Sequence, residues 1–310
     1  MSFFNLIDRL FQVELRQLEY FIAVASEMNY SRAAQRVHVV QSALSTSVSK
    51  LEKELGVELF DRSRQQIRIT PAGELFREHA RRVINTARLA RDSISDYRGA
   101  LSGTIEIGSL ITFGALDVPR ILGEFHREYP FVRIRLRDSQ LGSIAYLSAI
   151  ADGSLDLAFI SAPDRFPVGI DMRPLSREPM LFICRPDHHL AQRDHVGVAE
   201  LADEDLIGFP GQFGLQRIIV DAFTAAGIAP HVPYEAVVNY WVAANMVRHG
   251  LGTIFMPASD AGHFPDLRAL PLLPAIEWPI YLATAEERQI SPASAKLADL
   301  LIASASASAK

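Results

Sequence analysis

The chain has 310 residues, of which 49% are hydrophobic, so it can bury a sizeable core and should form two or three domains. It lacks an apolar run of about 18 residues, which excludes a typical membrane-spanning helix. Its one cysteine, Cys184, excludes an intramolecular disulfide and a cysteine-rich metal site. The net charge of −5 is uneven: residues 13–99 carry 14 Lys and Arg against 11 Asp and Glu, and residues 100–310 carry 16 against 24. Any polyanionic partner must therefore be bound by locally placed basic groups of the N-terminal part.

Residues 1–12, MSFFNLIDRLFQ, form an extension to the first predicted domain. Asp8 and Arg9 interrupt its apolar residues, so it makes a poor signal peptide and we expect a cytoplasmic protein. Val13 is a candidate for the natural first residue, from a valine codon read as methionine, and a genuine amphipathic extension is the alternative. N-terminal sequencing of the protein made from its own gene distinguishes the two.

Residues 30–55 predict two short helices joined by a tight turn, with Ser31 as a cap of the first. The second helix carries an apolar stripe at spacings of four, three and four residues: Leu44, Val48, Leu51 and Leu55. Its opposite face carries small hydroxyl side chains: Ser42, Ser45, Thr46 and Ser49. Such a helix suits close approach to another surface, as in a helix-turn-helix that enters the major groove of DNA. Two such helices also occur in ordinary all-α cores.

The flanking residues favour the DNA-binding interpretation. Upstream, an apolar pattern predicts a first helix that braces the pair: Leu15, Leu18, Phe21, Ile22 and Ala25. Downstream, residues 59–70, LFDRSRQQIRIT, predict a two-stranded wing with a polar, basic tip at residues 64–66. A wing of this kind can place an arginine in a minor groove.

Four sequence motifs follow one another within residues 13–80: ELRQL, SRAA, LEKELGVELFDR and TPAGE. With them the chain resembles the LysR-type transcriptional regulators, and the resemblance continues more weakly to about residue 303. It implies a winged helix-turn-helix, a long dimerisation helix and a two-lobed effector domain. The peroxide-sensing mechanism of one branch of the family needs two cysteines, so one chain that has Cys184 alone cannot use it.

Two positions depart from the family pattern of the DNA reader. Val40 replaces a serine or threonine cap, so we expect the cap to move to Ser42 or to be lost, at a cost of about 1 kcal/mol. Thr46 replaces a basic residue, so we expect an A·T-leaning half-site, with Gln41 at an adenine edge and the Thr46 methyl at a thymine. The predicted DNA-contacting residues, including basic anchors for phosphates or the minor groove, are Ser31, Arg32, Gln41, Ser42, Ser45, Thr46, Ser49, Lys50, Arg62, Arg64 and Arg68.

Residues 71–99 predict a long helix that follows the DNA-binding domain of residues 13–70. Thr70 is a suitable cap, Pro71 sits at the first helical position and Glu74 lies in the first turn. Apolar residues recur along it at alternating spacings of four and three: Phe76, Ala80, Val83, Ala87, Ala90, Ile94 and Tyr97. This heptad pattern predicts a coiled-coil contact in a homodimer, which the family often extends to a homotetramer. Packing along its own domain is the alternative.

After a break near residue 100, strands alternate with helices, which implies parallel sheets covered on both faces. We expect the last strand, residues 278–284, and the last helix, after Ser291, to return to the first of two α/β units. The predicted division is lobe 1 at residues 103–162 and 267–303, lobe 2 at residues 163–266, and a disordered tail at residues 304–310. This order resembles the type II periplasmic-binding-protein fold of the family's effector domains.

Ligands of open α/β sheets bind beyond the carboxyl ends of the strands, where helix N-termini face them. This rule predicts an effector cleft lined by Ser109, Thr112, Phe113, Ser161, Gln212, Phe213 and Gly214. Hydroxyls beside free helix N–H groups suit a small anion such as a carboxylate. Hydroxyls at helix starts are also ordinary caps.

Enzyme signatures are missing from the sequence. His188 and His189 are adjacent and lack metal-ligand spacing, and no G-x-S-x-G, P-loop or H-E-x-x-H motif occurs. We therefore expect no catalytic residue, no metal, no cofactor and no membrane partner. The predicted function is regulation of transcription by binding double-stranded operator DNA under the control of a small-molecule effector. The alternative is a small-molecule-binding protein whose N-terminal domain serves only in dimerisation, without salt-dependent affinity for DNA.

Overall fold

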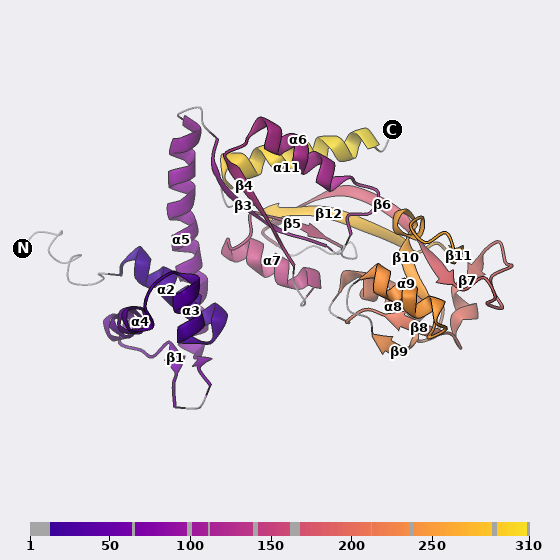
Figure 1. The fold of residues 1–310 in the computed structure, drawn as a ribbon, viewed down its shortest axis with the longest axis horizontal. Coiled ribbons are helices and arrows are strands. Elements are labelled where there is room, and N and C mark those ends of the chain that lie inside the picture. The colour runs from indigo at the N-terminus through magenta and orange to yellow at the C-terminus, as the bar shows by residue number, and fades with distance from the viewer. Residues whose placement is uncertain are drawn as a thin grey trace, which may run out of the picture. The chain divides into compact units, whose positions relative to one another are not determined.

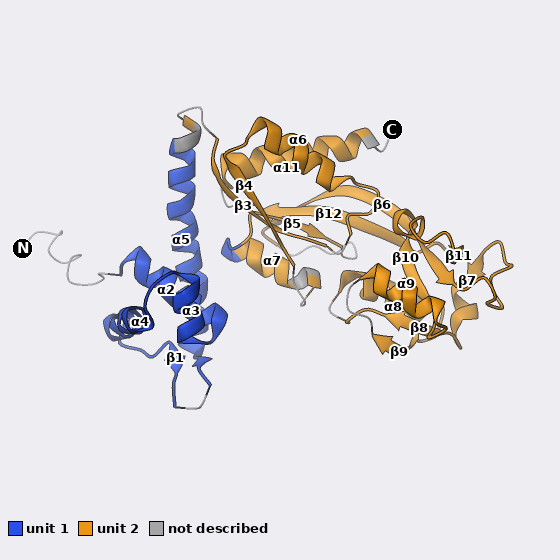
Figure 2. Ribbon diagram, in the orientation of Figure 1, with its two compact units in different colours: residues 1–94, 152–154 blue, residues 95–151, 155–310 orange. Residues whose placement is uncertain are grey.

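The computed structural model forms two compact units (Figure 2): one holds residues 1–94 with 152–154, and the other holds residues 95–151 with 155–310. The residues that it describes are 13–63, 66–97, 101–110, 112–138, 142–161, 168–211, 213–235, 239–286 and 290–308. The N-terminal extension of residues 1–12 lies outside them. None of the helices in these ranges combines the length and apolarity needed to span a bilayer.

The N-terminal unit is a helical domain with a short two-stranded wing (Figure 1). Its elements are α2 (Leu15–Glu27), α3 (Tyr30–Arg36), α4 (Gln41–Leu55), β1 (Phe60–Asp61), β2 (Arg68–Ile69) and α5 (Pro71–Tyr97). The strands pair antiparallel, with Phe60 opposite Ile69. Phe21 lies at the centre of the core, with its ring 5.3 Å from that of Phe60 and 5.1 Å from that of Phe76. The wing and the start of α5 are thereby fixed to α2.

The helix caps differ in part from the predicted ones. Asn29 caps α3 by accepting a hydrogen bond from the Arg32 N–H, so the prediction of Ser31 as the cap was wrong. Val40 precedes α4 without any side-chain bond, so of the two predicted outcomes the cap is lost. Thr70 caps α5 as predicted, because its Oγ1 accepts a 3.0 Å bond from the Gly73 N–H. A Cβ at Gly73 would lie 2.3 Å from the Leu59 carbonyl oxygen, so this close approach requires glycine.

Lobe 1 of the second unit is built on three parallel strands. These are β3 (Gly103–Gly108), β4 (Val132–Arg137) and β5 (Leu157–Ile160), and β12 (Glu277–Ala285) joins their edge antiparallel to β5. Helices α6 (Val118–Glu128) and α11 (Pro292–Ser308) cover one face and α7 (Gly142–Asp152) the other (Figure 1). The sheet is therefore mixed rather than wholly parallel.

Lobe 2 follows lobe 1 along the chain and continues its sheet. Its elements, with η1 a short 3-10 turn, are β6 (Ile170–Cys184), β7 (Val196–Gly197), η1 (Val198–Leu201), β8 (Asp205–Gly208), α8 (Gly214–Ala225), β9 (His231–Glu235), α9 (Tyr240–Arg248), β10 (Ile254–Pro257), α10 (Ala258–Ala261) and β11 (Arg268–Leu273). The strand order of the whole sheet is β4-β3-β5-β12-β6-β11-β7, and β10 also pairs with β6. Strands β8 and β9 form a separate two-stranded sheet.

The long strand β6 joins the lobes. Its first part, to Pro179, pairs with β12 in lobe 1, and its last residues pair with β10 and β11 in lobe 2 (Figure 1). The predicted return to lobe 1 at residue 267 is therefore too early by one strand, because β11 pairs only within lobe 2 and β12 makes the return. Sequence periodicity does not report which strands pair.

The predicted disordered tail at residues 304–310 was wrong over most of its length. Helix α11 continues to Ser308, and Ala305 is buried in the core of the unit. Alanine is the strongest helix former and serine is tolerated, so this composition extends a helix that already has a surface to pack on.

Candidate functional site

Helix α4 presents a polar face made of Gln41, Ser42, Ser45, Thr46, Ser49 and Lys50, here called the recognition face. Five of these six side chains are exposed and Ser45 is half-buried. The opposite stripe of Leu44, Val48 and Leu51 is fully buried, so the helix cannot rotate away without losing the core. The recognition face therefore does not pack against the interior of its own unit.

Ser31 of α3 fixes the amide of Gln41 at the start of α4. The Ser31 hydroxyl donates a 2.8 Å hydrogen bond to Gln41 Oε1. Pairing of glutamine with an adenine edge uses its oxygen and its nitrogen together. The bond from Ser31 uses one of the two lone pairs of Oε1 and holds the amide in place, so Nε2 and the second lone pair remain for a base edge. Sequence spacing alone did not reveal this contact.

The predicted basic anchors have different surroundings. Arg62 was expected at phosphates or the minor groove. Its guanidinium donates to the Tyr30 hydroxyl and lies 2.6 Å from Glu52 Oε2, so it holds the wing to the helices. Arg32 donates to the Glu27 carbonyl, and Lys50 lies 3.6 Å from Glu54. Arg68 is exposed on β2. Arg64 lies outside the described residues.

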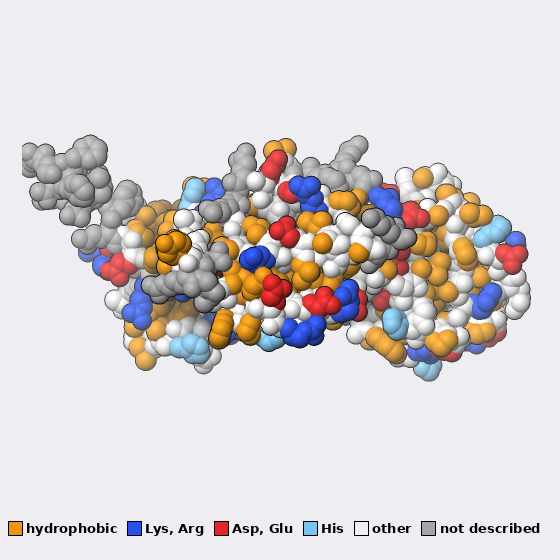
Figure 3. Space-filling view, turned by 90° about the horizontal axis from the view of Figure 1, so that it is seen from above, with side chains coloured by type: hydrophobic (Ala, Val, Ile, Leu, Met, Phe, Trp, Pro, Cys, Tyr) orange, Lys and Arg blue, Asp and Glu red, His pale blue; other side chains and the backbone are white. Residues whose placement is uncertain are grey.

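Charged side chains of both signs are interspersed over the face of the molecule seen in Figure 3. No large patch of one sign is visible on that face.

The second unit has a cleft at the carboxyl ends of the lobe 1 strands. Ser109, Asp138 and Ser161 follow β3, β4 and β5, and all three line it. The first residues of three helices face the same space: Gly142 of α7, Gly214 of α8 and Tyr240 of α9. The other lining residues are Leu110, Thr112, Tyr146, Phe213, Leu215 and Trp278. The cavity volume is about 30 Å³ in this conformation, so a bound small molecule would have to widen the cleft.

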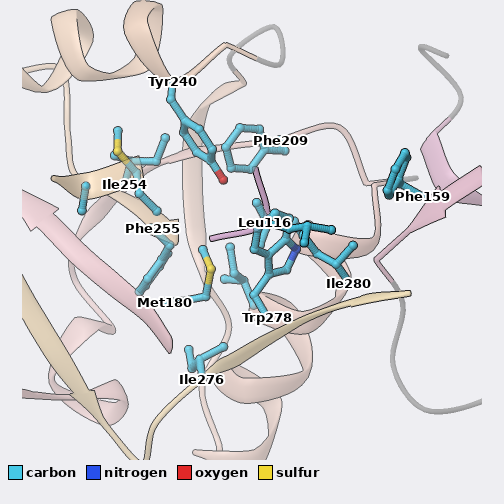
Figure 4. Packing of buried hydrophobic residues seen from close by; sticks show 14 of the residues in the cluster. Leu116, Phe159, Met180, Phe209, Tyr240, Ile254, Phe255, Ile276, Trp278 and Ile280 are labelled. Carbon is cyan, nitrogen blue, oxygen red and sulfur yellow. The ribbon is translucent and has the colours of Figure 1, made fainter. Parts of the chain in front are cut away.

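Three polar atoms of this lining are buried without a hydrogen-bond partner among the described residues: Ser161 Oγ, the Tyr240 hydroxyl and Trp278 Nε1. Figure 4 shows Tyr240 reaching from α9 toward Leu116 and Trp278. Burial raises the pKa of Tyr240 well above its usual value, so its hydroxyl keeps its proton. Buried polar groups are normally paired, and each unpaired one costs about 1–3 kcal/mol. Such a set is expected where a ligand supplies the partners.

Most of the residues predicted for the effector cleft line one space in the structure. Ser109, Thr112, Ser161, Phe213 and Gly214 line the space together. Phe113 does not line it, because its ring packs edge-on against Phe159 at 4.8 Å. Gln212 lies outside the described residues. The sequence reasoning missed Asp138, Tyr146, Tyr240 and Trp278.

Glu178 fixes the loop that carries Thr112. Its carboxylate accepts bonds from the Ala115 N–H, at 3.1 Å, and from the N–H and hydroxyl of Ser259 in α10, at 2.8 and 3.0 Å. Glu178 lies on β6 at the crossing between the lobes. One buried carboxylate therefore ties a lobe 1 loop to a lobe 2 helix beside the cleft.

Cys184, the last residue of β6, is a core thiol. It is completely buried, and burial raises its pKa to about 11, so the reactive thiolate is scarce at neutral pH. Cys184 is therefore an inert part of the core.

The apolar seam of α5 divides into two parts. Ala80 is buried and Phe76 packs on Phe21, so these two predicted dimerisation residues lie in the core of their own unit. Farther along, Val83, Ile94 and Tyr97 are 48%, 58% and 90% exposed. Ala87 is half-buried and Ala90 is exposed. Only this second part of the seam is open to another chain.

Both parts of the chain match protein families. Residues 15–74 match the bacterial regulatory helix-turn-helix proteins of the lysR family, and residues 98–306 match the LysR substrate binding domain. The HTH-type transcriptional regulator ShiR of Corynebacterium glutamicum is 32% identical over 263 residues, which cover 82% of this chain and 88% of ShiR.

Solved full-length structures show the same architecture. An OxyR variant from Pseudomonas aeruginosa superposes with a TM-score of 0.71 at 25% identity and covers 95% of both chains. CbnR, a LysR family transcriptional regulator, superposes with a TM-score of 0.66 at 25% identity, and the match covers 94% of this chain and 99% of CbnR. The winged helix-turn-helix, the long helix and the two-lobed domain together establish that the chain belongs to the LysR family of DNA-binding transcriptional regulators with an effector-binding domain.

Proposed function

We propose that this regulator reads its operator with the recognition face of α4, while Arg68 and the wing tip at residues 64–66 anchor the DNA backbone or the minor groove. The observation that carries the proposal is the exposed, hydroxyl-lined face over a completely buried stripe. Short hydroxyl side chains allow close approach to base edges, and the Thr46 methyl favours contact with a thymine methyl, as an A·T-leaning half-site requires. A cytoplasmic location follows from the DNA partner.

Gln41 should contribute discrimination at one base pair. Replacing Gln41 with alanine should reduce the binding free energy by about 1 kcal/mol for operators with the preferred base only, because the Nε2 donor is lost. Ser31→Ala should alter the preference at the same pair by releasing Gln41 Oε1. Base-substitution binding assays measure both. Arg68→Ala is the contrast. It should weaken binding to all DNA sequences alike and reduce the slope of log affinity against log salt concentration by about 1. Equal loss of specificity from Gln41→Ala and Arg68→Ala would contradict this division of roles.

We propose that the effector is a small carboxylate with an apolar body. The first residues of α7, α8 and α9 line the cleft. Asn239 already caps the N–H groups of α9, so α7 and α8 supply the termini that favour an anion. Trp278 Nε1 can only donate, and Ser161 and protonated Tyr240 can donate as well, so the unpaired groups call for acceptor atoms. Phe213, Leu215 and Leu110 supply apolar walls. A thermal-shift screen of small carboxylates against matched amides tests the charge preference, since a bound effector raises the melting temperature.

Ser161→Ala should weaken binding of the carboxylate found in that screen by about tenfold, because a hydrogen bond to a charged group contributes about 1.5–3 kcal/mol. Ser176→Ala is the matched control: Ser176 Oγ is also buried and unpaired in the described part of the chain, but Ser176 does not line the cleft. Titration calorimetry measures both. Equal affinities of the wild type and Ser161→Ala would show that the effector does not use this hydroxyl.

We propose that two copies pair along the open part of the α5 seam, at Val83, Ala87, Ala90, Ile94 and Tyr97. Their exposure and their heptad spacing support this interface, and a homodimer gives DNA recognition two half-sites. Further association to a homotetramer fits the same proposal. Sedimentation equilibrium of the full chain measures the assembly, and a monomer at micromolar concentration would refute the pairing.

A further inference from the structure

The turn that follows β6 brings two imidazoles to one buried carboxylate. His188 Nε2 lies 3.1 Å from Glu204 Oε2, and His189 Nε2 lies 3.4 Å from Glu204 Oε1. The three ligand-type atoms all lie within 4.8 Å of one another. Adjacent histidines alone lacked metal-ligand spacing in the sequence. The fold supplies a third group from the segment between η1 and β8.

The spacing of these atoms suits a transition-metal ion. Bonds of about 2.0–2.2 Å to imidazole nitrogen and carboxylate oxygen place neighbouring ligands of a tetrahedral ion about 3.3 Å apart. The two observed separations, 3.1 and 3.4 Å, are close to that value but end at different oxygens of Glu204. One ligand atom from each residue lies within 4.8 Å of the others, so the side chains must draw together to share an ion. The two imidazole rings lie 4.5 Å apart between centroids and are tilted by 34°.

The burial of the cluster also favours a cation. The Glu204 side chain is only 11% exposed, and its partners among the described residues are the two histidines rather than a lysine or arginine. A buried carboxylate that faces only imidazoles lacks a permanent counter-charge. His189 is 68% exposed, which leaves a route from solvent and an open position for water on the ion.

In the present arrangement the Leu190 N–H donates to His188 Nδ1, so the ring proton lies on Nε2 and is donated to Glu204. An ion on Nε2 would move the ring proton to Nδ1, where it would face the Leu190 N–H, so the His188 ring has to turn away from Leu190 when an ion binds.

We propose that His188, His189 and Glu204 form a site on lobe 2 for a divalent transition-metal ion of the Zn²⁺ class. Imidazole and carboxylate ligands are those that Zn²⁺ accepts, and three protein ligands leave one position for water. The ion would join the turn after β6 to the segment leading into β8, so its binding stabilises lobe 2. The site lies apart from the effector cleft, since none of its three residues lines that space.

Titration calorimetry of the untagged, full-length protein with zinc chloride tests the proposal. We expect one saturable site per chain, and a rise in the melting temperature that EDTA reverses. His189→Ala should lower the zinc affinity about tenfold or more, since one of three ligands is removed. Its exposed side chain makes this variant safe for folding. Glu204→Gln keeps the shape and an acceptor for His188 but removes the charge, and should also lower the affinity.

His231→Ala is the matched control. His231 Nδ1 lies 2.9 Å from Asp205 Oδ1, so it is another histidine–carboxylate pair of lobe 2 but has a single imidazole. We expect zinc binding to survive this substitution. An unchanged zinc affinity in His189→Ala, or an equal loss in His231→Ala, would overturn the proposal. The His188–Glu204 hydrogen bond would then only stabilise the turn.

Discussion

Thr46→Glu should abolish specific binding of this regulator to its operator while leaving the fold intact. Thr46 is exposed at the middle of the recognition face, and glutamate has a higher helix propensity than threonine. A carboxylate placed between DNA backbones meets like charge, which costs several kcal/mol, or about 100-fold or more in affinity. A gel shift with the intergenic DNA beside the gene, over a salt series, measures the loss.

Thr224→Glu makes the same charge change at an exposed position near the end of α8, in the C-terminal unit, and is the matched control. It should bind DNA as the unaltered chain does. If Thr46→Glu retained full affinity for DNA, the recognition face would not be the reading surface. If the unaltered chain itself showed no salt-dependent affinity for DNA, an N-terminal domain that serves only in dimerisation would be favoured instead.

Local patterns predicted the DNA-reading unit well because its signals are short in sequence. The apolar stripe of α4 and the Thr70-Pro71 start of α5 each lie within a few residues, and the structure confirms both. The bond from Ser31 to Gln41 and the ties of Arg62 to Tyr30 and Glu52 join different elements. The sequence pattern assigned Ser31, Gln41 and Arg62 to DNA contacts and gave Tyr30 and Glu52 no role, because such a pattern does not report contacts between elements.

The cleft shows the same limit at longer range. Ser109 and Ser161 were found because each directly follows a strand, and the carboxyl-end rule places such residues at a ligand site. Trp278 lies on the returning strand β12, and Tyr240 begins a helix of the other lobe. Their arrival at the same space depends on how β6 and β12 cross between the lobes, which periodicity does not specify. An unpaired buried donor is visible only once the fold is known.

The second large effect concerns stability: Glu52→Ala should destabilise the N-terminal unit by about 2–6 kcal/mol, because each of two buried N–H groups left without its acceptor costs about 1–3 kcal/mol. The Glu52 side chain is 8% exposed, and its Oε1 accepts bonds from the Leu59 and Phe60 N–H groups at 2.9 and 3.1 Å. Its Oε2 binds Arg62 at 2.6 Å. Alanine would leave two buried N–H groups and a guanidinium without these acceptors.

Urea unfolding of the full chain separates this effect from the rest of the molecule. Both tryptophans, Trp241 and Trp278, lie in the C-terminal unit, so circular dichroism should show an early loss of helix while tryptophan fluorescence keeps its midpoint. Glu54→Ala is the control, since Glu54 forms a surface pair with Lys50 at 3.6 Å, and should cost at most about 1 kcal/mol. Equal midpoints for the two variants would mean that Glu52 does not hold the wing against the helices. Because this carboxylate ties α4 to the wing, its loss should also weaken DNA binding before the unit unfolds.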